Sequence, residues 1–318
     1  MLRESPSGIW SIEMANGLTE MLDVTDRTVV ITGGATGIGF GLAMAFGARG
    51  ANVVIGEPRQ ARLDEAITKL SDSDIKARAI PMDVTDPQQL SDFAEQAFAA
   101  FGEVAVVVNN AGIGQARGSV IDTPVGELQK VMAVNFEGVW RGCQEFGRRL
   151  IDQGTPAGLY NTGSENSFFV AVSHSAAYVA SKHAVLGLTD CLREEMPDYI
   201  SVGMIAPGFV GSELIPEPMR PMGMPVDEFA ERVVPQMLAG ESYVVTHGYN
   251  QVRIDERQSQ IAHAYERSAP RAEGKKAQAD EQKQKFEQIL NQIFEQISQQ
   301  IWKDVRLPEP QGRKVRTF

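Results

Sequence analysis

The stretch Thr28-Val-Val-Ile-Thr-Gly-Gly-Ala-Thr-Gly-Ile-Gly39 decides the fold class of this chain. Its first four residues form a short β-branched run, which is typical of a buried strand. The glycine-rich turn TGGATGIG follows at residues 32–39, and FGLAMAFGARG then predicts a helix that ends at Gly50. A glycine-rich turn between a strand and a helix presents backbone N–H groups to a pyrophosphate. The stretch therefore predicts a dinucleotide-binding unit, with a turn that binds no ligand as the alternative.

The cofactor predicted for this turn is NAD, with NADP less favoured. The candidate cofactor residues of the turn are Gly33, Thr36, Gly37, Ile38 and Gly39. Glu57 ends the next predicted strand, 18 residues after Gly39. A carboxylate at that position can accept hydrogen bonds from ribose hydroxyls and would repel a 2′-phosphate. Arg59 lies nearby and could soften this preference, and a solvated loop acid is the alternative interpretation of Glu57.

The same alternation of strand and helix continues along the chain. Strands are expected at 52–55, 77–82, 104–108, 158–162, 202–205 and 243–246, and helices at 59–71, 87–101, 125–150, 176–196, 226–239 and 250–267. Short β-branched strands that alternate with helices predict a doubly wound, Rossmann-like parallel sheet of the α/β class. We expect a single catalytic domain over residues 24–270, preceded by an extension at 1–23. A proline- and methionine-rich lid is expected at about 208–225.

The composition changes after residue 270, and residues 271–318 predict a helical extension that ends in an arm. Apolar residues recur there at spacings of three and four, which indicates an amphipathic helix. They are Phe286, Ile289, Leu290, Ile293, Phe294, Ile297 and Ile301. This helix either folds back on its own domain or pairs with another subunit.

Charge and composition exclude several classes of protein. The chain of 318 residues has a formal net charge of −11 and no basic cluster in its first 270 residues, which argues against nucleic acid or an anionic membrane as partner. The two cysteines do not suggest a disulfide framework, and the four histidines lack metal-ligand spacing, so no metal site is expected. No apolar run approaches membrane length, and the N-terminus lacks the order of a signal peptide. We therefore expect a reduced, cytoplasmic setting.

The stretch Tyr178-Val-Ala-Ser-Lys182 predicts the catalytic base. A tyrosine and a lysine four residues apart lie on one face of a helix. An ammonium group one turn away favours the phenolate and lowers the pKa of the phenol, so that Tyr178 becomes a usable general base. Alone, this spacing is weak evidence, because a surface tyrosine beside a solvated lysine has the same pattern.

Several motifs now stand in one order: TGGATGIG, Asp83, NNAG at 109–112, Asn135, a serine-bearing strand end, Y-x-x-x-K and Pro207-Gly208. Over roughly residues 24–250 this order resembles the short-chain dehydrogenase/reductase family. The resemblance implies that Tyr178 is the base and that Lys182 binds the nicotinamide ribose. It also implies that Asn135 holds a water in a proton relay and that Ser212 contacts the carboxamide. The further cofactor residues that it implies are Asp83, Val84, Asn109, Ala111, Gly112, Pro207, Gly208 and Val210.

The sequence offers two candidates for the catalytic serine. Family members usually place it 13 residues before the tyrosine, where this chain has Glu165. Ser164 is one residue earlier and follows Asn-Thr-Gly, so we assign Ser164 and infer one extra loop residue. Ser167 is the alternative, and a third possibility is that neither serine contacts substrate. The hydroxyl is required to hold the substrate oxygen beside the tyrosine.

The loop after the sixth strand is rich in apolar residues, and Phe168 and Phe169 follow the serine. This lining favours a hydrophobic or aromatic alcohol or ketone, unless these residues only pack the lid. The region after residue 240 is similar to that of family members acting on bulky aryl alcohols, including the lignin-derived aryl ether (Cα) dehydrogenases. The resemblance also implies a homodimer or homotetramer. A non-catalytic NAD sensor or scaffold, and an epimerase or dehydratase, are the alternative functions on this fold.

Overall fold

The computed structural model describes residues 2–4, 10–12, 21–114 and 118–268, and short stretches between 281 and 293. Contacts between residues divide the chain into two units, Met1–Ile254 and Asp255–Phe318. We describe each unit by itself. The first unit contains the predicted dinucleotide-binding motifs and all candidate site residues.

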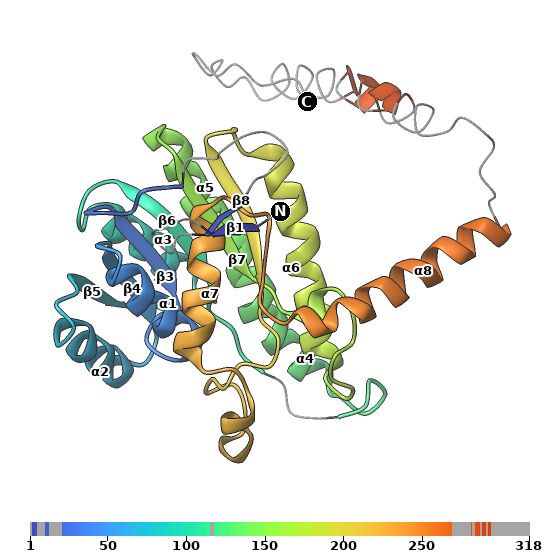
Figure 1. Ribbon diagram of the computed structural model, residues 1–318, viewed down its shortest axis with the longest axis horizontal. Coiled ribbons are helices and arrows are strands. Elements are labelled where there is room, and N and C mark those ends of the chain that lie inside the picture. Colours follow the sequence, from blue (N-terminus) through green and yellow to red (C-terminus); the bar gives the residue numbers. More distant parts are fainter. Residues whose placement is uncertain are drawn as a thin grey trace. The chain divides into compact units, whose positions relative to one another are not determined.

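The first unit is built on a parallel sheet that has seven strands within the described residues (Figure 1). In spatial order the strands are β5 (Ala77–Pro81), β4 (Asn52–Glu57), β3 (Thr28–Thr32), β6 (Val104–Asn109), β7 (Ala157–Thr162), β8 (Ile200–Ala206) and β9 (Tyr243–Val245). Every adjacent pair is parallel. The strand order reverses between β3 and β6, and ligands bind at such a switch point in open α/β sheets. The predicted Rossmann-like, doubly wound sheet is confirmed.

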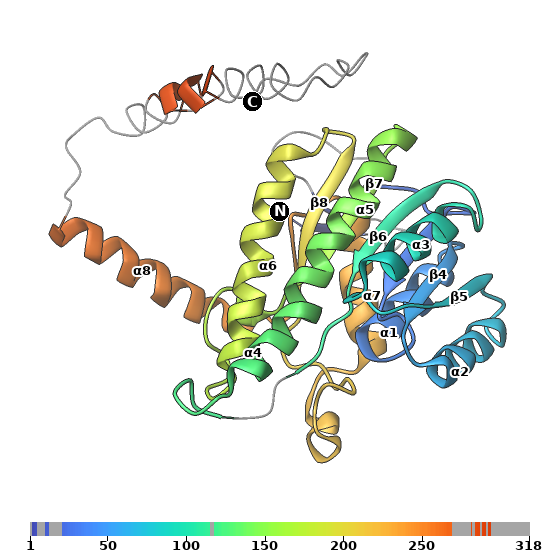
Figure 2. The ribbon, with the colours of Figure 1, turned by 180° about the vertical axis from the view of Figure 1, so that it is seen from behind.

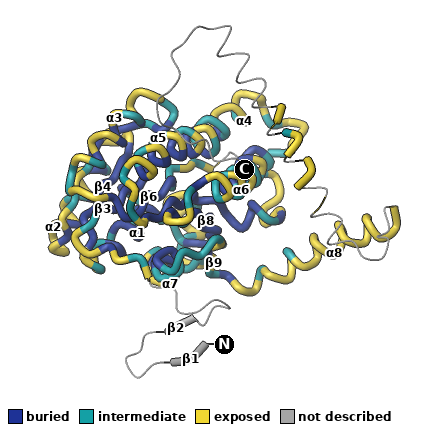
Figure 3. The backbone as a smooth tube through the Cα atoms, turned by 90° about the horizontal axis from the view of Figure 1, so that it is seen from above, coloured by how far each residue is buried: buried dark blue, intermediate teal, exposed yellow. Residues whose placement is uncertain are grey.

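Helices cover both faces of this sheet (Figure 2). One face carries α1 (Gly37–Gly47), α2 (Gln60–Ser71) and α7 (Val226–Leu238), and the other carries α3 (Pro87–Phe98), α5 (Gly138–Gln153) and α6 (Ala176–Glu195). Side chains of a strand alternate between these layers. Val29 and Ile31 therefore pack with α1 and α7, whereas Val30 packs with α3 and α5. The central strands β3, β4 and β6 are buried from both sides (Figure 3), which explains their runs of β-branched residues. The edge strands β5 and β9 are partly exposed.

The prediction of a single α-helix at 125–150 is wrong in one respect. The structure divides it into α4 (Val125–Met132), a π-helical segment at Ala133–Glu137, and α5. A π segment inside an α-helix is rare and is often found at a functional site. Here it contains Asn135, which is fully buried.

The predicted lid forms a closed loop rather than a fully irregular segment. Its ends pair through a bridge between Val210 and Met224, and Gly211 N donates to Met224 O at 2.9 Å. A 3₁₀ helix at Glu217–Met222 forms the tip of the loop. The loop therefore projects from the carboxyl edge of the sheet as a compact unit.

The structure also describes elements near the two ends of the chain. The strands β1 (Leu2–Glu4) and β2 (Trp10–Ile12) pair antiparallel within the predicted N-terminal extension. Helix α8 (Gln251–Ser268) matches the helix expected at 250–267, and its residues are mostly exposed. The amphipathic helix and arm predicted for 271–318 fall mostly outside the described residues. Among the helices that the structure describes, none is long and apolar enough to cross a bilayer.

Candidate active site

The glycine-rich turn lies at the carboxyl end of β3, beside the switch point of the sheet. Gly33 and Gly37 have φ values of 63° and 53°, which side chains other than glycine rarely adopt. A Cβ on Gly39 would lie 2.2 Å from the carbonyl oxygen of Gly33, so a side chain there would prevent the close packing of α1. Thr36 is the N-cap residue of α1, and its hydroxyl makes no capping hydrogen bond. The turn therefore leaves the N-terminus of α1 open to an anionic group.

The NNAG segment is tied to this turn by Thr32, which was not assigned a role from the sequence, and by Asn110 of the predicted motif. Thr32 Oγ1 accepts hydrogen bonds from the N–H groups of Asn110 and Ala111, at 2.9 and 3.1 Å. The Asn110 amide donates to the carbonyl oxygens of Thr32 and Gly33, at 3.0 and 3.2 Å. Thr32 and Asn110 thus hold the two loops at the switch point together. Each residue lies at the end of a predicted strand, and this position was the feature of the sequence that could have identified its role.

Asn109 faces the protein interior. Its amide donates to Asn161 Oδ1 at 2.9 Å, and Cys143 packs against it. It therefore joins β6 to β7 beneath the site. Gly112, by contrast, lies beside the candidate catalytic residues, because a Cβ there would be 3.7 Å from Lys182 Nζ.

The acidic candidates stand at the ends of β4 and β5. Glu57 is buried, and its carboxylate accepts hydrogen bonds from the Arg59 backbone N–H and from Arg59 Nε. Asp83 Oδ1 accepts from the backbone N–H and the hydroxyl of Thr85, both at 2.8 Å. Val84 is buried against Gly138 at the start of α5. Both carboxylates are thus held at the edge where the adenosine end of a dinucleotide would lie.

Tyr178, Lys182 and Ser164 come together, although they belong to α6 and to the loop after β7. The Lys182 ammonium lies 5.7 Å from the centre of the Tyr178 ring and donates to Thr162 O at 2.8 Å. Ser164 is hydrogen-bonded to the Tyr178 side chain. The arrangement places a hydroxyl, a phenol and an ammonium group at one point of the carboxyl edge.

Burial dominates the electrostatics of this group. It raises the pKa of the Tyr178 phenol, and the hydrogen bond from Ser164 opposes that effect. Burial also lowers the pKa of Lys182 to about 8. Among the protein groups at this site, the loss of hydration outweighs the hydrogen bond from Ser164, so the pKa of Tyr178 is raised. The lowering of this pKa by Lys182 stays a prediction.

Ser167, the alternative serine, is engaged elsewhere. Its hydroxyl donates to Lys182 O at 2.7 Å and accepts from Ser164 N at 3.2 Å. It is almost completely buried. Ser167 therefore fixes the loop on α6, and Ser164 presents the hydroxyl beside Tyr178.

Asn135 binds the loop that follows NNAG. Its Oδ1 accepts from Ile113 N at 2.8 Å, and its Nδ2 donates to Ile113 O at 2.9 Å and to Ser181 Oγ at 3.2 Å. Ser181 in turn donates to Tyr178 O at 2.7 Å. Asn135 therefore links the π segment, the cofactor loop and the catalytic helix by its side chain.

The Pro207-Gly208 turn and the lid close the site from the other side. Pro207 O accepts from Glu165 N at 3.0 Å, and Val210 is buried. Ser212 Cβ lies 3.2 Å from the position that a Cβ on Gly37 would take, so the lid lies directly over the glycine-rich turn. Arg62 of α2 also forms an ion pair with Glu213 at 3.2 Å.

The apolar residues near the site divide into two groups. Phe168 stacks edge-on against Tyr243, with ring centres 6.0 Å apart, and Phe169 is buried. In the lid, the exposed apolar residues are Leu214, Met219 and Met222. Three polar residues that were not assigned from the sequence also lie here: Glu165, His247 and Asn250.

These features fit a dinucleotide. A pyrophosphate fits the open N-terminus of α1, because the glycines of the turn leave free the space that a Cβ would occupy. A ribose fits the buried Glu57 carboxylate, which can accept hydrogen bonds from its hydroxyls. Within the described residues, no three His, Cys, Asp or Glu side chains gather closely enough to hold a metal ion.

Comparisons with known proteins agree with this geometry. A profile described as short chain dehydrogenase matches residues 27–219. "Probable oxidoreductase EphD" of Mycobacterium tuberculosis is 40% identical over 197 residues, which are 60% of this chain and 32% of that protein. The chain therefore spans about a third of the length of that relative. The 1-deoxy-11-beta-hydroxypentalenate dehydrogenase of Streptomyces arenae is 33% identical over 203 residues, 62% of this chain and 72% of that protein.

The chain is also similar to a further relative and to a solved structure. The C alpha-dehydrogenase of Sphingobium sp. strain SYK-6 is 29% identical over 195 residues, 61% of this chain and 64% of that protein. Among solved structures, a short chain dehydrogenase/reductase of Burkholderia phymatum in complex with NAD has a TM-score of 0.71 at 22% identity, and the match covers 77% of this chain and 97% of that chain. That structure supports the fold alone.

Proposed function

Because the chain belongs to the short-chain dehydrogenase family, we propose that it is an oxidoreductase that interconverts a secondary alcohol and a ketone with a nicotinamide cofactor. The observation that carries the proposal is the meeting of Ser164, Tyr178 and Lys182 at the carboxyl edge of the sheet, beside the glycine-rich turn. A bound nicotinamide would accept the hydride from the carbinol carbon.

Three residues of the chain bind the substrate oxygen and move its proton. Ser164 donates a hydrogen bond to the substrate oxygen and holds it beside Tyr178. Tyr178 removes the hydroxyl proton as the carbinol carbon is oxidised. Lys182 remains cationic and favours the phenolate, with its ammonium fixed by Thr162 O. Because burial raises the pKa of Tyr178, the base must gain its activity from positive charge brought near it.

The preferred cofactor is NAD. Glu57 is buried at the end of β4, and its carboxylate would meet the adenosine ribose. A 2′-phosphate would be repelled there, although the ion pair with Arg59 reduces the repulsion.

The substrate class is a hydrophobic or aromatic alcohol or ketone. Apolar side chains of the lid, Leu214, Met219 and Met222, are exposed near the site. Two relatives are named a C alpha-dehydrogenase and a 1-deoxy-11-beta-hydroxypentalenate dehydrogenase. These names support an alcohol with a large hydrocarbon part as the substrate. We also expect a homo-oligomer in the cytoplasm.

Turnover by the purified chain tests the proposal. We expect oxidation of benzylic secondary alcohols with NAD, followed as NADH formation, and a decrease of kcat of at least about a hundredfold in Tyr178→Phe. Tyr160→Phe is the matched control, because Tyr160 is buried in the core on β7 and donates to Met237 O. Equal activity in Tyr178→Phe and the native chain would refute the assigned base.

The cofactor preference has its own test. Glu57→Gln removes the charge and keeps the size, so the ratio of kcat/KM with NADP to that with NAD should rise about tenfold, which corresponds to roughly 1.4 kcal/mol. Arg59→Ala should move the ratio in the opposite direction, because it removes the cation nearest to the 2′ position. A ratio that Glu57→Gln leaves unchanged would contradict the role of Glu57.

A further inference from the structure

The Glu165 carboxyl is a buried acid that the proposed reaction does not use. It follows Ser164 directly in the chain, and only 8% of the residue is exposed. Its Oε2 lies 2.6 Å from the position that a Cβ on Gly208 would take. Gly208 follows β8 at the carboxyl edge of the sheet, so the carboxyl lies between the ends of β7 and β8. Because Ser164 is the preceding residue, a substrate oxygen held by Ser164 would lie at this same edge of the sheet.

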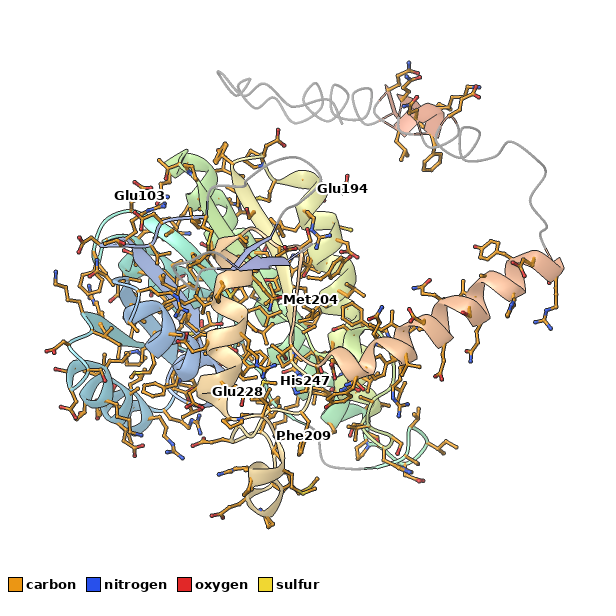
Figure 4. All side chains as sticks on the ribbon, viewed as in Figure 1. Glu103, Glu194, Met204, Phe209, Glu228 and His247 are labelled. Atoms are coloured by element: carbon orange, nitrogen blue, oxygen red, sulfur yellow. The ribbon has the colours of Figure 1, made fainter. Side chains whose placement is uncertain are left out.

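Two residues that follow β9 complete a polar cluster around Gly208. Asn250 Nδ2 donates to Glu165 Oε2. The His247 ring lies 2.6 Å from the same Cβ position on Gly208, and His247 is 9% exposed. In Figure 4, His247 lies near Phe209, below Met204 of β8. The acid therefore joins the loop that carries Ser164 to the segment after the last strand.

The second carboxylate oxygen is not sealed inside the protein without a partner. Within the described residues, Arg27 Nε is the one buried side-chain N or O atom that lacks a hydrogen-bond partner. Burial of the carboxyl nevertheless raises its pKa, because the charged form loses hydration, and this loss is the cost of keeping an acid here. A glutamine could accept the same bond from Asn250 without this cost. The acid is therefore not explained by the connection to Asn250 alone.

We propose that Glu165 is a specificity-determining residue that accepts a hydrogen bond from a second donor group, a hydroxyl or an amine, of the alcohol substrate. The proposal rests on the function proposed above and narrows its substrate class. Since Ser164 holds the reacting oxygen and Glu165 is the next residue, the second donor lies within a few bonds of the reacting carbon. The pocket then combines an apolar lid with one polar corner formed by Glu165, His247 and Asn250.

Paired substrates that differ by one hydroxyl test this assignment. The probes are 1-phenylpropan-1-ol and 1-phenylpropane-1,2-diol, measured with NAD and with NADP. A hydrogen bond to a charged acceptor corresponds to roughly a tenfold to hundredfold preference in kcat/KM for the diol. We expect this preference in the native chain, a reduced preference in Glu165→Gln, and its loss in Glu165→Leu while the mono-alcohol is still oxidised. Asn250→Ala, which removes the donor and keeps the acid, should retain the preference.

Three outcomes would overturn the inference. They also distinguish a failure of the Glu165 assignment from a failure of the proposed function. If the native chain oxidises both probes at equal kcat/KM, the Glu165 assignment is wrong while the dehydrogenase proposal stands. If Glu165→Gln and Asn250→Ala reduce both probes by the same factor and lower Tm together, Glu165 is only a structural connection. If no member of a broad alcohol panel is oxidised with either cofactor, the proposed function fails and this inference fails with it.

Discussion

The Lys182 ammonium group lies in surroundings that disfavour its charged form. It is buried, and burial lowers its pKa from 10.5 to about 8. A depressed pKa of a base means that the unfolded chain binds its proton more tightly than the folded chain. The burial of this charge therefore costs roughly 3 kcal/mol of stability below pH 8, and the cost disappears as pH rises from 8 to 10.5.

Lys182→Met should abolish activity and increase the stability of the fold. The substitution removes the buried charge and forfeits the hydrogen bond to Thr162 O, which is worth about 1 kcal/mol. We expect the free energy of unfolding at pH 6.5 to rise by roughly 2 kcal/mol and the activity to be lost. Urea unfolding of both proteins at pH 6.5 and at pH 10 measures this, and the gain should be smaller at pH 10. A gain that is equal at both pH values would show that the charge is not the cause.

The sequence predicted the pairing of Tyr178 with Lys182 but not the electrostatics of the pair. A spacing of four residues places both on one face of a helix, whatever surrounds them. The pKa of Tyr178, however, depends on burial by loops from other parts of the chain. The polar residue Glu165 was visible beside Ser164, but its contact with Gly208 and Asn250 depends on the tertiary structure.

The π segment at Ala133–Glu137 is the element that connects the cofactor loop to the catalytic helix. Its Asn135 side chain makes three hydrogen bonds, two of them to the backbone of Ile113. The sequence predicted one helix over 125–150, and the residue types at 133–137 do not mark the change from i→i+4 to i→i+5 hydrogen bonds. The presence of Asn135 in the motif order was predictable, but the local change of helix type was not.

Asn135→Ala tests this connection. The substitution leaves the partly buried N–H and carbonyl of Ile113 without their side-chain partner, so we expect a loss of about 1–2 kcal/mol in the free energy of unfolding. The kcat should also fall at least about tenfold, because the loop that brings Gly112 beside Lys182 becomes less ordered.

Asn135→Asp is the matched variant. It keeps an acceptor for Ile113 N and loses the donation to Ile113 O and to Ser181, so its effects should be intermediate. Urea unfolding and initial rates of all three proteins measure the series. An alanine variant that unfolds at the native urea concentration would remove the structural role assigned to Asn135.

At the scale of the whole molecule, the sheet was the most predictable feature. The central strands β3, β4 and β6 are buried from two sides, so their sequences are rich in β-branched residues. The alternation of strands with helices predicts a doubly wound sheet. The lid was predicted as irregular, because its four prolines exclude a long helix. Its closure over Gly37 depends on the bridge between Val210 and Met224, which no local pattern indicates.

The surface of α4 and α5 bears on the proposed homo-oligomer. Trp140 and Ile151 of α5 are 47% and 44% exposed, and Leu128 of α4 is 40% exposed. Trp140 and Ile151 are eleven residues apart, about three helical turns, so they lie on one face of the helix. Large apolar side chains on one exposed face are typical of a surface that another subunit covers.

Trp140→Glu should therefore disrupt the assembly. A carboxylate placed at the centre of an apolar interface loses hydration without gaining a partner, and large aromatic residues contribute strongly to such interfaces. We expect light scattering after size exclusion to give a smaller mass for Trp140→Glu than for the native chain. Arg78→Glu, an exposed charge change on the edge strand β5, is the control and should leave the mass unchanged. If the native chain is a dimer or tetramer and Trp140→Glu keeps its mass, the subunits associate through a surface other than α4 and α5.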